Sequence, residues 1–225
     1  MRKTIGILGG MGPLATVELF RRIIALTPAK RDQEHLRIVI DSNLQIPDRT
    51  AAILGEGESP LPMLIETARN LEKAGADLIA IPCNTAHFYL SEIQSAVKVP
   101  IIDMIGETVR RIEVGKVGLL ATEGTRRSGV YGHACVARGI DIIYPSAPDQ
   151  KWIMETIYAI KSGTATDRFQ NGIIGVIERI RQAGAEGAIL GCTELSLIPL
   201  PDKVSILVYD VLTILAKTAV ERAFS

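Results

Sequence analysis

Aromatic residues are scarce in this sequence: Phe, Trp and Tyr together make up 4% of its 225 residues. So few rings cannot line the stacking surface on which single-stranded nucleic acids bind. An excess of one charge is also absent, because 25 Lys and Arg residues balance 25 Asp and Glu residues. The sequence therefore predicts no nucleic-acid partner and no attachment to an anionic membrane surface.

Long hydrophobic runs are missing as well, since no apolar stretch reaches the ~18 residues that a membrane-spanning helix needs. The N-terminus begins with positive charges, but its apolar run lasts only a few residues before Gly9 and Gly10 interrupt it. This segment predicts a first strand instead of a signal peptide. We therefore expect a cytoplasmic protein that does not enter a membrane.

Cysteine is rare too. The three residues Cys83, Cys135 and Cys192 form neither an even disulfide framework nor a CxxC pair. We expect free thiols in a reducing compartment and no metal site. A redox dithiol is disfavoured because the spacing lacks the CxxC geometry that tunes such sites. Cys135 falls within an expected helix and reads as an idle buried thiol, and His87 reads as local packing.

Short apolar runs alternate with longer helical patterns along the chain. The expected strands cover residues 4–8, 36–40, 78–81, 101–102, 116–120, 141–143, 187–190 and 204–207. The expected helices cover residues 13–26, 62–73, 88–97, 106–112, 129–138, 150–161, 167–182 and 211–222. This alternation predicts an α/β fold with parallel sheets covered on both faces. Ligands of such folds bind at the carboxyl ends of the strands.

The sequence contains an internal repeat. AGADLIAIPCNT at residues 74–85 aligns without gaps with AGAEGAILGCTE at residues 183–194, and TIGILGG at residues 4–10 matches KVGLLAT at residues 116–122. We therefore expect two similar lobes related by a pseudo-twofold axis. Each lobe would place one cysteine, Cys83 or Cys192, at the carboxyl end of an equivalent strand, so that the two thiols face one cleft.

Two facing cysteines indicate proton-transfer chemistry. A thiolate can remove a proton from one face of a carbon while a thiol returns one to the other face, which inverts a stereocentre. A neighbouring carboxylate can delocalise the carbanion if hydrogen-bond donors surround its oxygens. Small polar residues suited to this follow the expected strand ends: Asn84, Thr85, Thr122, Thr125 and Thr193. Because no lysine has a setting that argues for pyridoxal phosphate, we expect no cofactor.

Three motifs resemble a known family, the cofactor-independent aspartate/glutamate racemases. PCNTAH at residues 82–87 and GCTEL at residues 191–195 resemble its two cysteine signatures. GGMGPLAT at residues 9–16 resembles the opening loop of the aspartate racemase branch. The resemblance implies two flavodoxin-like lobes, one of residues 1–99 plus 207–225 and one of residues 100–206, and a homodimer. It also implies a two-base mechanism in which Cys83 and Cys192 transfer the proton.

The resemblance also implies roles for the residues around the cysteines. Asn84, Thr85 and Thr193 match positions that hold the carboxylate and amino group of the amino acid. Arg49, in PDRT, and Lys161, in YAIKSG, match cations that hold the distal carboxylate. These matches imply that the substrate is aspartate.

Two departures from the glutamate racemases favour the aspartate branch. Those enzymes usually carry histidine where this chain has Glu194, and aspartate in the opening loop where it has glycine. The position of Glu194 beside Cys192 favours a place in the site over a simple cap. Met11 either closes over the cleft or fills the core.

Other functions remain open. Residues 10–15 fit the dinucleotide motif G-x-G-x-x-A after a strand, but Asp41 lies about 30 residues on, where ~20 is usual. Relatives with this fold racemise glutamate, several amino acids or hydantoins, isomerise maleate or decarboxylate arylmalonates, as the resemblance implies. A non-catalytic protein that binds an acidic amino acid is a further alternative.

Overall fold

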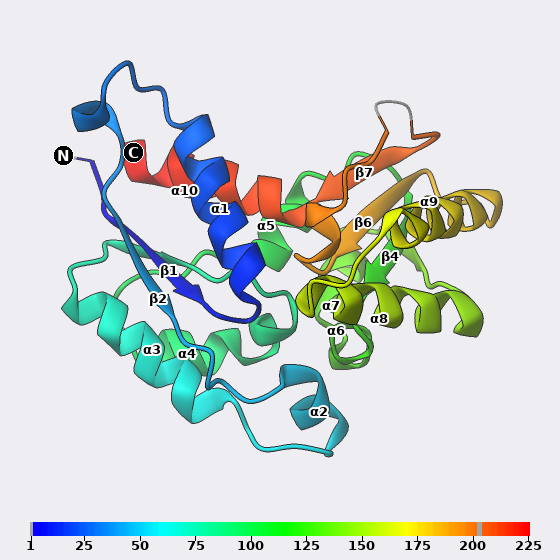
Figure 1. Ribbon diagram of the computed structural model, residues 1–225, viewed down its shortest axis with the longest axis horizontal. Coiled ribbons are helices and arrows are strands. Elements are labelled where there is room, and N and C mark those ends of the chain that lie inside the picture. Colours follow the sequence, from blue (N-terminus) through cyan, green and yellow to red (C-terminus); the bar gives the residue numbers. More distant parts are fainter. Residues whose placement is uncertain (1, 202–203) are drawn as a thin grey trace.

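The computed structural model describes residues 2–201 and 204–225, and it forms two lobes, each built on one parallel sheet (Figure 1). The first sheet has the order β2-β1-β3, with β1 at Ile5–Gly9, β2 at Ile38–Ser42 and β3 at Leu78–Ala80. The second has the order β5-β4-β6-β7, with β4 at Lys116–Ala121, β5 at Asp141–Ile143, β6 at Gly187–Gly191 and β7 at Leu207–Asp210. The predicted α/β fold of two lobes with parallel sheets is confirmed.

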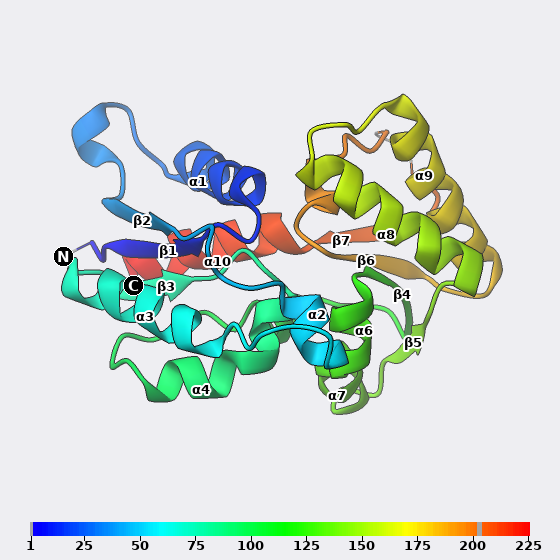
Figure 2. The same cartoon turned by 60° about the horizontal axis from the view of Figure 1, so that its bottom comes forward.

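Helices cover both faces of each sheet (Figure 2). The first half of the chain contributes α1 (Pro13–Leu26), α2 (Arg49–Leu54), α3 (Leu61–Lys73), α4 (Leu90–Ser95) and α5 (Met104–Arg110). The second half contributes α6 (Glu123–Ser128), α7 (Val130–Val136), α8 (Ala147–Lys161), α9 (Asp167–Gln182) and α10 (Val211–Phe224). Short 3-10 turns lie at Asp32–Glu34, Thr85–Tyr89 and Leu195–Leu197. No helix among the described residues is both long and apolar enough to cross a bilayer.

The repeat in the sequence is a repeat in the structure. β1 and β4 hold equivalent central places, and β3 and β6 each lie beside them. The single parallel bridge from Ile79 to Ile101 repeats the pairing of β6 with β7. The helices that follow are capped alike, because Asp103 accepts a hydrogen bond from a backbone N–H at the start of α5 and Asp210 does so at the start of α10. The two halves of the chain therefore run through the same series of elements.

The C-terminal helix joins the lobes. α10 follows β7 of the second sheet but packs on α1 and α5, and Arg22 of α1 pairs with Asp210 at 2.6 Å (Figure 1). α5 in turn packs on α7 of the second half. One apolar core runs through both lobes as a result, and it contains Leu19, Leu119 and Leu215.

Local signals explain where the elements differ from those expected. β2 and β7 each begin two or more residues later than predicted, and the expected helix over residues 129–138 shortens to α7. Gly129 has a φ of 71°, so it ends α6 and separates it from α7. The short helices α2 and α6 were not expected, although Asp48 and Thr122 cap them with their side chains.

The division into lobes at residues 99/100 and 206/207 stays a prediction. β7 pairs with β6 in the second sheet, and Ile101 pairs with Ile79 in the first. Both pairings favour boundaries a few residues further along the chain than those expected.

Glycine lets a helix approach the central strand of each sheet. A Cβ on Gly6 of β1 would lie 3.3 Å from the Cβ of Leu71 of α3, and one on Gly118 of β4 would overlap the side chain of Ile180 of α9. We expect Gly118→Ala to cost about 1–3 kcal/mol of unfolding free energy, because a well-packed core resists added atoms. The measurement is denaturant unfolding, followed by circular dichroism.

Gly132→Ala is the matched control. Gly132 lies inside α7, and a Cβ there would meet only the Tyr144 hydroxyl, at 3.6 Å. We expect this variant to be as stable as the parent protein or more stable by up to about 1 kcal/mol, because alanine favours helix interiors. A Gly118→Ala protein as stable as Gly132→Ala would contradict the close strand–helix contact.

Candidate active site

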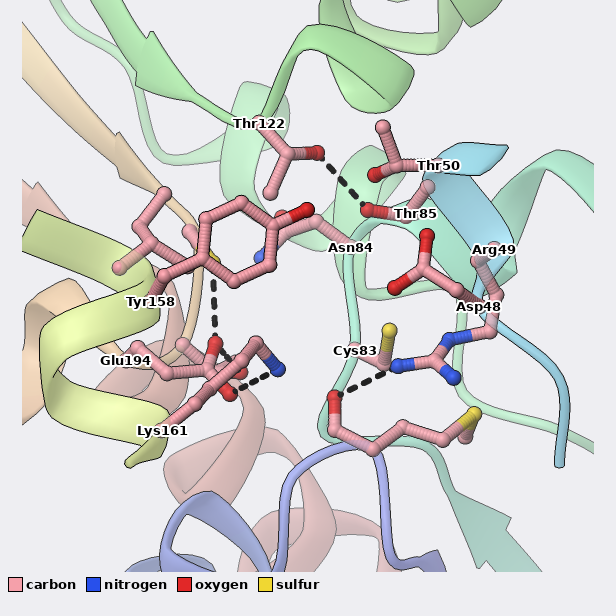
Figure 3. Close-up of a pocket in the computed structure, with 14 residues that line it drawn as sticks. Asp48, Arg49, Thr50, Cys83, Asn84, Thr85, Thr122, Tyr158, Lys161 and Glu194 are labelled. Carbon is pink, nitrogen blue, oxygen red and sulfur yellow. Dashed lines mark hydrogen bonds and ion pairs between the residues drawn. The ribbon is translucent and has the colours of Figure 1, made fainter. Parts of the chain in front are cut away.

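One pocket lies between the lobes, at the carboxyl ends of the central strands (Figure 3). About 380 Å³ of empty space, part of it open to solvent, lies between its side chains. The loops after β1, β3, β4 and β6 supply most of its wall, together with α2 and α8. Its lining residues are Met11, Asp48, Arg49, Thr50, Cys83, Asn84, Thr85, Thr122, Ile157, Tyr158, Lys161, Cys192, Thr193 and Glu194.

Every site residue expected from the sequence lines this pocket, except Thr125. Thr125 stands directly behind the wall, where its hydroxyl lies 2.8 Å from that of Thr85 and 3.0 Å from that of Thr122. The hydroxyls of Thr85 and Thr122 are also 3.0 Å apart (Figure 3). Three hydroxyls from two lobes therefore form a closed hydrogen-bonded triangle, and Thr125 supports the other two.

Cys192 lies against a buried carboxylate. Its thiol donates a hydrogen bond to Glu194 Oε2 at 2.9 Å. Burial raises the pKa of the Cys192 thiol well above its usual range, and the negative charge of Glu194 raises it further. The Lys161 ammonium lowers the pKa but does not offset the other two effects. This side of the pocket therefore presents a protonated thiol.

Glu194 is 2% exposed and bridges the lobes. Its Oε1 accepts from Lys161 Nζ at 2.7 Å (Figure 3). The same oxygen accepts from the backbone N–H of Gly12, in the opening loop of the first lobe, at 3.1 Å. Burial pushes the pKa of Glu194 upward, but the Lys161 charge and the Cys192 donor lower it below its usual value. Burial likewise opposes the charge of Lys161, yet Glu194 raises the lysine pKa. Both partners remain ionised, so the cation expected to hold a distal carboxylate already has a counter-ion.

Arg49 is the cation on the opposite wall. It lies at the start of α2, and its Nη1 donates to the carbonyls of Ile46 at 3.1 Å and Pro47 at 2.8 Å. Its Nη2 reaches the carbonyl of Met11 at 3.5 Å. Within residues 2–201 and 204–225, Arg49 Nε is buried without a hydrogen-bond partner, and Arg49 forms no ion pair. The side chain is thus fixed by neutral carbonyls and keeps its charge for a ligand.

Asn84 offers a second uncommitted donor. Its Oδ1 accepts a hydrogen bond from the Tyr131 hydroxyl at 2.6 Å, across the lobe boundary. The Nδ2 amide is buried and lacks a partner within the part of the chain that the structure describes. On the facing lobe, the Thr193 hydroxyl donates to the Pro82 carbonyl at 3.0 Å. These bonds fix the two segments that carry the cysteines relative to each other.

Met11, Cys135 and His87 are all buried, and of these three Met11 lines the pocket. Met11 is 3% exposed, and it both lines the pocket and packs in the core. Cys135 is buried in the shared core away from the pocket, and burial raises its pKa to about 11. His87 Nε2 accepts from the Met104 N–H at 3.2 Å, so its Nδ1 carries the proton and donates to the Cys83 carbonyl at 2.8 Å.

Four pocket residues were not expected from the sequence. Asp48 and Thr50 flank Arg49 in the segment PDRT. Their position beside an expected site residue was the signal that could have placed them in the pocket. Ile157 and Tyr158 precede Lys161 by four and three positions on α8, a spacing that places all three on one face of a helix. The helix had been predicted, so this spacing was a usable signal. No group of three His, Cys, Asp or Glu side chains that could hold a metal occurs among the described residues.

Comparison with known proteins gives the family. The family described as Asp/Glu/Hydantoin racemase matches residues 8–219. A broad specificity amino-acid racemase of Bacillus subtilis is 32% identical over 200 residues, which cover 86% of each chain. An aspartate racemase of Picrophilus torridus has a similar structure, with a TM-score of 0.88 and 32% identity over 99% of this chain and 94% of that one. An aspartate racemase homologue of Pyrococcus horikoshii has a TM-score of 0.80 and 28% identity over 99% and 100%.

The chain therefore belongs to the Asp/Glu/hydantoin racemase family. It is an amino-acid racemase, and so an isomerase, of that family. The resemblance read from its motifs is confirmed at this level. The names of its relatives state different substrates, so family membership leaves the substrate of this chain as a separate question.

The contact between Glu194 and Cys192 makes a prediction about proton affinity. Glu194→Gln removes the negative charge beside the thiol and leaves Lys161 without its counter-ion. Both changes favour the thiolate, so we expect the pKa of Cys192 to fall. The measurement is a pH titration of thiolate ultraviolet absorbance in a Cys83→Ser, Cys135→Ala background, where a single thiol remains.

Glu178→Gln is the control for this titration, since it makes the same charge change on the exposed face of α9. It should leave the Cys192 titration where it was. A Glu194→Gln protein whose Cys192 titrates at the same pH or higher would contradict the electrostatic account of the site.

Proposed function

We propose that this protein interconverts L- and D-aspartate by cofactor-independent proton transfer at the α-carbon, with Cys83 and Cys192 as the two proton-transfer groups. The observation that carries the proposal is the placement of two thiols from equivalent strand ends, β3 and β6, in the wall of one pocket. The Cys192 side of that wall holds a protonated thiol. A two-base mechanism needs one acid and one base. Cys192 is the acid for one direction of the reaction, and we assign the base to Cys83.

The step balances with these residues alone. The Cys83 thiolate takes the α-hydrogen, and the electron pair of the broken C–H bond moves into the adjacent carboxylate. The Cys192 thiol then gives its proton to the opposite face of the α-carbon. Cys83 leaves the step as a thiol and Cys192 as a thiolate, and the reverse reaction restores both. Glu194 and Lys161 lie beside Cys192, so they affect the energy of the form left after one turnover.

The donors around the pocket support the carbanion. Asn84 Nδ2 is a buried donor without a partner among the described residues, and the hydroxyls of Thr85 and Thr122 line the same wall. Donors that are already in place when charge develops stabilise a transition state without the cost of reorganising water. We assign the α-carboxylate of the substrate to the Asn84 amide, which the hydroxyls of Thr85 and Thr122 can join only by breaking a bond of their triangle with Thr125.

Arg49 supports aspartate as the substrate. Lys161 is neutralised by Glu194 at 2.7 Å, whereas Arg49 bonds, within the described ranges, to carbonyl oxygens alone. A guanidinium in a partly enclosed site binds a carboxylate strongly and with defined geometry. We therefore assign the distal carboxylate to Arg49 and not to Lys161. A broad-specificity racemase is the second candidate, because such an enzyme of Bacillus subtilis is 32% identical to this chain. The expected homodimer and cytoplasmic location stay predictions.

Removing either catalytic thiol tests the proton-transfer pair. We expect Cys83→Ala and Cys192→Ala each to lower the rate of racemisation by about 100- to 10,000-fold or more, as loss of a general acid or base does. The measurement is formation of D-aspartate from L-aspartate, with α-deuterium incorporation in D2O and no added cofactor. Cys135→Ala removes a thiol outside the pocket and should retain the activity of the parent protein. A Cys83 or Cys192 variant that racemises at the parent rate would remove that residue from the mechanism.

Arg49 decides between an aspartate racemase and a broad-specificity one. We expect Arg49→Met to raise KM for aspartate by about 10- to 100-fold, the effect of losing a charged hydrogen bond, while any activity on alanine keeps its KM. Kinetics with aspartate, glutamate and alanine as substrates give the comparison. An equal loss with aspartate and alanine would show that Arg49 does not hold the distal carboxylate. A parent protein that racemises alanine as efficiently as aspartate would favour the broad-specificity candidate.

A further inference from the structure

Among the described residues, one hydrogen bond holds the Asn84 side-chain amide, and that bond comes from the other lobe. Asn84 follows Cys83 at the end of β3 and is 2% exposed, whereas Tyr131 lies on α7 and is fully buried. The Tyr131 hydroxyl lies 2.6 Å from Asn84 Oδ1, and the Asn84 Nδ2 has no partner in the described part of the chain. The free enzyme thus keeps a buried NH2 group unpaired at the wall of its pocket.

The side-chain amide of an asparagine can flip, which exchanges the positions of its oxygen and its nitrogen, and the two orientations differ chemically. In one, the NH2 group faces the pocket and can donate to a carboxylate. In the other, the carbonyl oxygen faces the pocket and repels a carboxylate. The shapes are nearly identical, so hydrogen bonds must select between them. A donor placed on the oxygen side selects the orientation that binds an anion.

The Tyr131 hydroxyl is suited to be that donor. Burial raises the pKa of the Tyr131 phenol above its usual range, so the hydroxyl stays protonated at any working pH. Its ring is packed in the apolar core shared by the lobes, where α7 meets α5, which fixes where the hydroxyl points. The Thr108 hydroxyl gives its proton to the Met104 carbonyl at 2.7 Å and makes no hydrogen bond with Tyr131 in the part of the chain that the structure describes. Tyr131 therefore has a proton to give, and Asn84 Oδ1 receives it at 2.6 Å.

We propose that Tyr131 is a positioning residue that turns the Asn84 amide donor toward the α-carboxylate of the substrate. The inference rests on the proposed function for the identity of the ligand, an α-amino acid. It adds a residue outside the pocket wall, on the opposite lobe from Asn84, that determines whether the carboxylate subsite attracts or repels an anion. Tyr131 does not touch the substrate and acts only through Asn84.

Equilibrium binding separates this role from catalysis. The experiment measures the affinity for L- and D-aspartate by calorimetry in a Cys83→Ser background, which stops turnover. We expect Asn84→Ala to weaken binding by about tenfold or more and Tyr131→Phe by about five- to tenfold, because each removes or misdirects a hydrogen bond to a charged group. Combined with Asn84→Ala, the Tyr131→Phe change should add less than about twofold, since residues that act through one another are not additive.

Tyr209→Phe is the matched control. Tyr209 is another buried tyrosine, and its hydroxyl accepts a hydrogen bond from the Glu113 N–H at 3.2 Å, away from the pocket. It should leave aspartate affinity unchanged, although its unfolding temperature can fall as much as that of Tyr131→Phe. The binding data thus distinguish a positioning role from a bond that merely joins the lobes.

Each outcome has one reading. Tyr131→Phe with the affinity of the parent protein, or with an equal further loss in the Asn84→Ala background, would overturn the inference. A fall in unfolding temperature without a fall in affinity would do the same and leave the bond a structural one. If the Cys83→Ser protein binds neither enantiomer of aspartate, the proposed substrate is wrong, and the same four variants measured with alanine then test Tyr131 separately.

Discussion

The buried carboxylate of Glu194 is the constraint around which the site is organised. An isolated carboxylate at this depth would be far too costly, and removing the partner of a buried charge costs about 3–5 kcal/mol. Three donors among the described residues stabilise it: Lys161 and Gly12 at Oε1 and Cys192 at Oε2. A Cβ on Gly12 would lie 3.2 Å from Oε1. A side chain at this position of the opening loop would therefore crowd the Glu194 carboxylate. The carboxylate therefore fixes the approach of the lobes, the charge of Lys161 and the proton on Cys192 together.

The two lobes repeat the same arrangement of strands and cysteines, but the residues near each cysteine differ. The repeat gives both lobes a central strand with a glycine under a helix, and a cysteine at the end of the neighbouring strand. Two equivalent thiols are what a reaction in either direction needs. The residue two places beyond each cysteine differs, with Thr85 in one lobe and Glu194 in the other. Of the two thiols, Cys192 has a carboxylate as hydrogen-bond acceptor within the described residues, and the charge of that carboxylate helps to raise the pKa of Cys192.

The motifs and the repeat were enough to predict the two sheets and most of the pocket, because side chains at the carboxyl ends of parallel strands must meet. Ion pairing was not predictable in the same way. Lys161 and Glu194 are 33 positions apart and were both expected to bind substrate, yet they bind each other. Tyr158 was missed although helix spacing placed it beside Lys161. Tyr131 carries no motif, and only the packing of α7 across the lobe boundary brings its hydroxyl to Asn84.

The two proposed anchors for substrate both lie on the first lobe. Asn84 stands at the end of β3 and Arg49 at the start of α2, and the second lobe supplies the proton donor Cys192. Contacts within one lobe hold Arg49 through the carbonyls of Ile46 and Pro47, whereas Asn84 depends on Tyr131 from across the boundary. The first lobe alone therefore sets the distance between the two substrate carboxylates that the pocket can bind. The orientation of the Asn84 donor depends on both lobes. The contact between the lobes therefore orients the Asn84 donor in the same arrangement that places Cys192 in the pocket wall.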